Sequence, residues 1–122
     1  MDADPKDLID WDIADELFAP QEDPDGTAMQ MEIWSSLRSD LSTDLEQAAR
    51  EKNPEALKSH LHRIRGYCST CALSRLGGLL RAWEDCGDPV AASADFGPKA
   101  LAMVPSSIAS VETKFPHLCG AV

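Results

Sequence analysis

Apolar residues recur every three or four positions along most of the chain, which is the spacing of a helix with one buried face. Four such stripes follow residue 30, and each is long enough for a helix. They comprise Trp34, Leu37, Leu41, Leu45 and Ala48; Leu57, Leu61, Ile64, Cys68 and Cys71; Leu76, Leu79, Leu80 and Trp83; and Leu101, Val104, Ile108, Val111 and Phe115. No segment carries the alternating pattern of a strand. The pattern therefore predicts an all-α protein.

Residues suited to helix ends set the expected boundaries of the first two stripes. Thr27 and Gln30 match a capping box, in which both side chains bond free backbone N–H groups. The first long helix is therefore expected to run from Thr27 to about Lys52. Asn53 and Pro54 suit the N-cap and the first helical position, so the next helix is expected to begin there.

The second half of the chain is expected to contain two further helices. Ser74 can cap the first of them, which should end near Gly87 with Pro89 just beyond. A linker rich in alanine, serine and proline is expected to follow. Pro105 lies within the last stripe, where it either kinks the last helix or marks its true start.

Residues 1–26 form an acidic leading segment with a short apolar pattern, followed by a loop rich in proline and aspartate over residues 20–26. The apolar positions are Leu8, Trp11, Leu17 and Phe18. Helices joined by short loops predict an antiparallel up-and-down four-helix bundle, here with a short additional N-terminal helix. With 122 residues and 43% apolar content, residues 1–122 are expected to form one domain, with the bundle in 27–118.

The net charge of −10 argues against nucleic acid and anionic membranes as partners, because both require clustered cations. Residues 56–83 nevertheless hold five Lys and Arg residues and no acid. This basic stretch is either an ordinary solvated face or a docking face for an acidic protein surface. No apolar run reaches the length of a membrane span, and the chain does not open like a signal peptide, so a soluble, cytoplasmic protein is expected.

The four cysteines are too sparse for a disulfide framework, so they are expected to be reduced. Cys68 and Cys71 have the spacing of a redox or zinc pair. However, Cys86 and Cys119 do not form a second close-spaced ligand pair, and no strand precedes the motif. Core packing is therefore the favoured interpretation, and no metal site is expected.

His62 has the neighbours that a phosphoryl acceptor needs. On a helical wheel His62, Arg65, Gly66 and Ser69 point away from the apolar stripe together. An exposed imidazole can act as nucleophile, and Arg65 can reach the phosphoryl oxygens. Gly66 lies beside the histidine and costs a helix interior roughly 1 kcal/mol relative to alanine, so close approach of a partner is a reason for it.

The other two histidines have weaker claims. His60 falls near the edge of the apolar stripe and is expected to be partly buried. His117, between Pro116 and Leu118, is expected to lie at the surface.

The run His62-Arg63-Ile64-Arg65-Gly66 resembles the His-x-Leu-Lys-Gly signature of histidine-containing phosphotransfer (HPt) domains. The similarity continues through Cys71-Ala72-Leu73 and the leucine-rich helix, and extends to Ile9-Asp10-Trp11-Asp12 and Phe115-Pro116-His117-Leu118. The resemblance implies a four-helix core, phosphorylation at His62, a cation at Arg65 and a docking glycine at Gly66. Arg65 in place of lysine, and Tyr67-Cys68 in place of small residues, depart from the pattern. On the wheel Tyr67 points away from His62, so it is not expected to block docking.

The resemblance also implies partners and a function. We expect a monomeric phosphocarrier without kinase activity, which relays a phosphoryl group between response-regulator receiver domains, with a hybrid sensor kinase as a further candidate partner. Lys58, Arg63, Gly66 and Ser69 are the expected docking residues. No cofactor is expected, because the receiver would bring Mg²⁺.

Two alternatives stand beside this function. One is a pseudo-HPt module that docks on a receiver or kinase domain without carrying phosphate, which the intact His62, Arg65 and Gly66 disfavour. The other is a redox or metal protein that uses Cys68 and Cys71.

Overall fold

The computed structural model describes residues 8–119, and these residues contain helices and no strand. The α-helices are α2 (Trp11–Phe18), α3 (Pro24–Arg50), α4 (Pro54–Thr70), α5 (Ser74–Asp85) and α6 (Pro89–Lys114), and the 3₁₀-helix η1 (Pro116–Cys119) follows them. The all-helical class predicted from the sequence is confirmed. None of the described helices is long and apolar enough to span a membrane.

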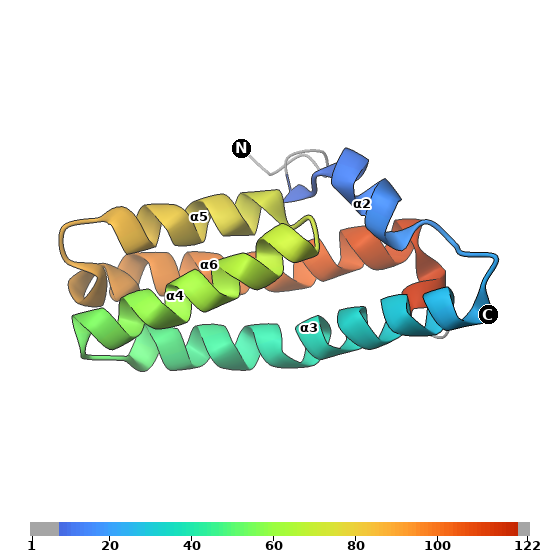
Figure 1. The fold of residues 1–122 in the computed structure, drawn as a ribbon. Coiled ribbons are helices and arrows are strands. Elements are labelled where there is room, and N and C mark those ends of the chain that lie inside the picture. The colour runs from blue at the N-terminus through green and yellow to red at the C-terminus, as the bar shows by residue number, and fades with distance from the viewer. Residues whose placement is uncertain (1–7, 120–122) are drawn as a thin grey trace.

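The four long helices α3 to α6 lie side by side, and successive helices run in opposite directions (Figure 1). α6 packs against both α3 and α5, so it closes the bundle. The short helix α2 lies across one end, near the turn between α4 and α5 (Figure 1). There the backbone N–H of Asp10 donates to the carbonyl of Ala72 at 2.9 Å. This bond ties the leading segment to the α4–α5 turn.

The apolar stripes of α3, α4 and α5 face the core, as their spacing predicted. All of their members are buried except Leu79, which is half-buried. Two tryptophans lie in this core with their indole N–H groups bonded. Trp34 donates to Oε2 of Glu112 at 2.9 Å, and Trp83 donates to the carbonyl of Pro89 at 2.9 Å. Both bonds fix α6 against its neighbours.

The capping box predicted at Thr27 and Gln30 is wrong. α3 begins at Pro24, and its N-cap is Asp23, whose Oδ1 accepts from the backbone N–H of Asp25 at 3.0 Å. An aspartate followed by a proline at the first helical position is itself a good start signal, so the helix begins one turn earlier than expected.

Gln30 instead holds the loop before α3. Its buried Nε2 donates to the carbonyls of Leu17 at 2.8 Å and Ala19 at 2.9 Å, and its Oε1 lies 3.2 Å from Nε2 of His117. His117 is therefore half-buried and tied to α3, whereas we expected it at the surface. The contacts join the end of α2, α3 and the distant His117, and no local pattern reveals them.

The start of α4 was predicted correctly and the cap of α5 was not. Oδ1 of Asn53 accepts from the N–H groups of Glu55 and Ala56 at 2.9 and 3.2 Å. Ser74 is the first residue of α5, and the N-cap is Leu73, which makes no side-chain cap bond. α5 ends at Asp85, two residues before the expected end.

The linker expected before the last helix is helical. α6 begins at Pro89, directly after Asp88, whose Oδ1 accepts from the N–H of Ala91 at 3.1 Å. The helix continues through Pro98 and Pro105, so Pro105 does not mark its start. Each proline removes one backbone bond, but the helix buries a face against α3 and α5, and that burial outweighs the local cost.

Gly97 lies where α6 packs tightly against α3. A Cβ atom at Gly97 would stand 3.1 Å from Cβ of Ala49, whereas one at Gly78, on α5, would meet nothing within 4 Å. The two glycines are both helical, so they offer a matched comparison.

We therefore expect Gly97→Leu to destabilise the protein by about 1–3 kcal/mol, because overpacking forces the helices apart. The control Gly78→Leu should leave the melting temperature unchanged or raise it, because its higher helix propensity adds up to about 1 kcal/mol to the free energy of unfolding. Thermal melts followed by circular dichroism measure both. Equal melting temperatures would contradict the close contact of α6 with α3.

Candidate functional site

His62 lies on the exposed face of α4. Its side chain is 72% exposed, while the flanking Leu61 and Ile64 are fully buried. His60 is half-buried, as predicted. The helical spacing therefore placed these histidines correctly, and His62 is the more exposed of the two.

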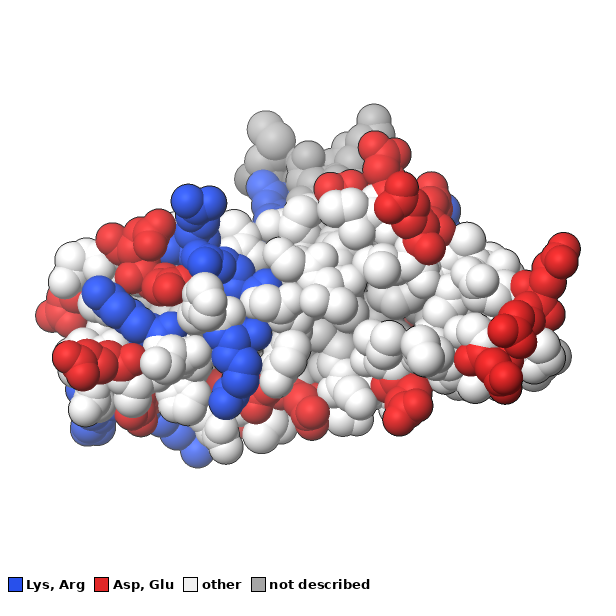
Figure 2. Space-filling model, in the orientation of Figure 1, with Lys and Arg blue, Asp and Glu red and all other residues white. Residues whose placement is uncertain are grey.

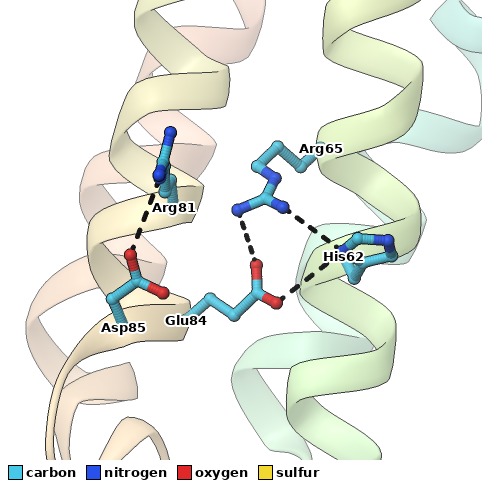
Figure 3. A network of polar contacts seen from close by, with 5 residues as sticks. All are labelled: His62, Arg65, Arg81, Glu84 and Asp85. Atoms are coloured by element: carbon cyan, nitrogen blue, oxygen red, sulfur yellow. Dashed lines mark hydrogen bonds and ion pairs between the residues drawn. The ribbon is translucent and has the colours of Figure 1, made fainter.

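Arg65 and Glu84 lie beside His62 (Figure 3). Nη1 of Arg65 lies 2.9 Å from Oε2 of Glu84, and its Nη2 lies 3.3 Å from Nδ1 of His62. The same Nδ1 is 3.7 Å from Oε1 of Glu84. Arg65, predicted from its spacing to His62, is thus confirmed as its neighbour.

Glu84 was missed in the sequence. It comes from α5, directly after the acid-free basic stretch, and reaches the site because α5 packs against α4. Its side chain is only 19% exposed, and Oε2 is buried without an aligned hydrogen-bond donor. The 2.9 Å contact with Arg65 is therefore a charge contact. Glu84 follows the buried Trp83, and that position beside the core stripe is the signal that could have indicated it.

The two ring nitrogens of His62 have different surroundings. Nδ1 faces Arg65 and Glu84, while the other ring nitrogen points away from both (Figure 3). The guanidinium of Arg65 has only donors, so its 3.3 Å contact needs a lone pair on Nδ1 and places the proton of a neutral ring on Nε2. In the other tautomer the proton lies on Nδ1, faces Oε1 of Glu84 at 3.7 Å, and leaves the lone pair of Nε2 free at the surface. The arrangement can thus present Nε2 as a nucleophile with a permanent cation close by.

Gly66 and Ser69 lie on the exposed face of α4, as predicted. A Cβ atom at Gly66 would meet nothing within 4 Å, so packing does not require glycine there. Ser69 lines a groove between α4 and α5 together with Arg65, and Ile13 of α2 closes one side of it. The site is therefore continuous with a surface that reaches α2.

The other two expected docking residues are less close to this groove. Lys58 is exposed one turn before His62. Arg63 turns toward α3, where its Nη2 lies 3.9 Å from Oδ1 of Asp44, and the same atom is 3.5 Å from Nδ1 of His60. The structure does not bring Arg63 into the group around His62.

Acids from elsewhere in the chain partly neutralise the basic stretch. Three of its five cations form ion pairs: Arg63 with Asp44, Arg65 with Glu84, and Arg81 with Asp85. Figure 2 shows basic and acidic side chains mixed at this end of the molecule. The stretch is thus less basic in the fold than in the sequence.

A surface of exposed large apolar side chains, which we call the apolar face, was not foreseen. It comprises Ile13 and Leu17 of α2, Met29 and Ile33 of α3, and Tyr67 of α4. Ile33 and Tyr67 line one shallow hollow, and Leu17, Met29 and Ile33 line a second. Figure 2 shows a broad region without charged side chains, next to the end where basic and acidic side chains are mixed. Three helices contribute to the apolar face, so no single stripe reveals it.

A family model for the Hpt domain matches residues 32–113. The matched segment contains α4 and α5 whole, and it includes His62, Arg65 and Glu84. Comparisons with curated proteins and with solved structures gave no match.

The cysteine pair lies in the core. Cys68 and Cys71 are free and buried, and Cys86 is free and half-buried. The side chain of Cys119 lies outside the described part of the chain. Burial raises the pKa of Cys68 to about 12, with a contribution from Cys71, and burial raises the pKa of Cys71 to about 11. Both thiols are therefore protonated at neutral pH, which is unlike a reactive pair. No cluster of metal-binding side chains occurs among the described side chains of residues 8–118.

We expect a variant with Cys86→Ser and Cys119→Ser to resist a thiol reagent at pH 8 while folded and to expose both remaining thiols in guanidinium. Chelator should not change its melting temperature. Since the thiols ionise near 9.0 when unfolded but near 11–12 when folded, stability should fall as the pH rises from about 9 to about 11. Fast labelling of the folded variant, or stoichiometric zinc, would overturn the core assignment.

Proposed function

Because the chain belongs to the Hpt domain family, we propose that His62 carries a phosphoryl group between the aspartates of two receiver domains. Membership in the family implies phosphotransfer in two-component signalling. The observation that supports His62 as the carrier is its exposed imidazole, with Nδ1 beside Arg65 and Glu84 and Nε2 directed outward.

In the proposed step, Nε2 of His62 attacks the phosphorus of a receiver's aspartyl phosphate. The Nε2–P bond forms as the P–O bond to aspartate breaks, and the carboxylate leaves with the bonding electrons. This step uses the tautomer with its proton on Nδ1, so the N–H of Arg65 must turn away from Nδ1, and the Nδ1 proton then faces Glu84. Arg65 supplies positive charge for the phosphoryl oxygens, and the receiver supplies the Mg²⁺. Transfer to the second receiver is the reverse reaction with a different aspartate.

The receiver is proposed to dock over Gly66 and Ser69, with Ile13 and the rest of the apolar face packed beneath it. Exposed apolar surface rimmed by charge is typical of protein interaction sites. Lys58 and Arg63 are proposed contacts at the edge, where charge steers encounter more than it holds the complex. We propose that the protein is cytoplasmic and that its long helices form an up-and-down bundle. We also propose that it acts as a monomer, so that no second copy covers the face around His62.

The proposal is tested by incubating the protein with phosphorylated receivers and measuring acid-labile, base-stable label. His62→Gln should abolish the label. His60→Gln, a matched change two residues away, should leave it intact, because His60 is half-buried and lacks the contacts with Arg65 and Glu84. Loss of label only in His60→Gln would refute the assignment. Receiver binding without any label on the wild type would instead favour the pseudo-HPt alternative.

Gly66 provides a second test, which separates docking from folding. Gly66→Ala should melt at the same temperature or higher, since nothing lies within 4 Å of the new atom. Its higher helix propensity should add up to about 1 kcal/mol to the free energy of unfolding. Gly66→Gln should also fold. Its side chain would stand one turn from His62, where a misplacement of about 1 Å can cost on the order of a hundredfold in rate. A thermal melt and a transfer time course on the same variant measure both effects. Normal transfer by Gly66→Gln would exclude docking over this surface.

A further inference from the structure

Arg65 is shared between His62 and Glu84. One of its terminal nitrogens contacts the imidazole at 3.3 Å and the other contacts the carboxylate at 2.9 Å. A phosphoryl group would be attached to Nε2, on the side of the ring away from Arg65, so the guanidinium would have to leave its contacts with Nδ1 and Glu84 to reach it. Within the described residues, no other Lys or Arg contacts the imidazole of His62.

We propose that Glu84 sets the free energy of the phosphorylated state, by competing with the phosphoryl group for Arg65. Glu84 is thus a positioning residue: by raising the free energy of phosphorylated His62, it makes transfer of the phosphoryl group to a receiver more favourable. This inference rests on the proposed function, because it requires His62 to be the carrier.

The burial of Glu84 supports this competition. Its side chain is 19% exposed and Oε2 is shielded from solvent, so water screens its charge less than it would at the surface. The pair of Arg65 and Glu84 sums to zero charge, whereas Arg65 alone would present one positive charge to a dianionic phosphoryl group. Removing the negative charge of Glu84 should therefore stabilise the phosphorylated state.

Replacing Glu84 with glutamine tests the effect of its negative charge separately from its shape. Glutamine has nearly the same shape, and its amide oxygen can still accept from an Nδ1 proton. A single charge near a partly exposed ion pair changes an equilibrium constant by about two- to tenfold. Glu84→Gln should raise the phosphorylation equilibrium constant of His62 by that factor.

The neighbouring Asp85 offers a matched control. It also lies on α5, but it is 66% exposed and pairs with Arg81 at 3.7 Å instead of with the His62 group. Asp85→Asn removes the same charge from the next residue, so it should leave the equilibrium constant unchanged.

The experiment uses phosphoramidate as donor at a fixed ratio to ammonium. Its P–N bond breaks, the Nε2–P bond forms, and ammonia leaves, so no receiver is needed. Intact-mass spectrometry measures the phosphorylated fraction at equilibrium, His62→Gln gives the background, and thermal melts confirm folding. We expect more phosphorylation in Glu84→Gln than in the wild type, less in Arg65→Gln, and no change in Asp85→Asn.

The opposite signs for Glu84→Gln and Arg65→Gln separate this competition from a structural role, in which both variants would shift the equilibrium the same way. A folded Glu84→Gln with a wild-type or lower fraction would overturn the proposal. If that variant failed to fold, the double variant Arg65→Gln/Glu84→Gln should match Arg65→Gln alone, because no arginine is left to compete for. A phosphorylated fraction well above that of Arg65→Gln would show that Glu84 acts on the phosphoryl group directly, and would overturn the proposal. Failure of the proposed function appears separately, as a wild type that takes label from phosphoramidate but from no phosphorylated receiver.

Discussion

The packing of α4 against α5 is the contact on which the site depends. The buried stripe of α4 meets that of α5, so their flanking positions are brought together: His62 and Arg65 from one helix, Glu84 from the other. The turn between the helices passes through Ala72, which has a φ of 65°. Because alanine adopts this conformation only at some cost, the packed helices and the bonds of the turn must hold it. The carbonyl of Ala72 also anchors Asp10, so one short turn places α2 and its apolar side chains beside the site.

The site combines a rigid support with features that cost stability. Leu57, Leu61 and Ile64 are completely buried, so α4 cannot rotate to hide His62. Gly66 lowers helix propensity without a packing reason, and Glu84 is largely removed from water. The contact between Arg65 and Glu84 compensates for that desolvation. The bundle tolerates these costs because its large apolar residues, including Trp34 and Trp83, are buried in the core.

Local sequence signals were reliable only where they agreed with packing. Asn53 caps α4 as its residue type predicts. The capping box at Thr27 and Gln30 does not form, because α3 already begins at Pro24 with Asp23 as its N-cap. The largest error was α6, because its prolines, its glycine and its serines have low helix propensity. Those small residues allow α6 to approach α3 closely at Gly97, and the burial gained by packing exceeds the local preference.

The sequence by itself determined that His62, Arg65 and Gly66 share one exposed face, because residues on a single helix keep fixed angular positions. It also determined the buried stripes of α3, α4 and α5, and from these the helical class. Only the tertiary structure decided which acid meets Arg65, where Gln30 and His117 lie, and that side chains from three helices form one apolar face. Such contacts depend on the register and rotation between helices, which are set by the packing of the whole core and not by the spacing within any one helix.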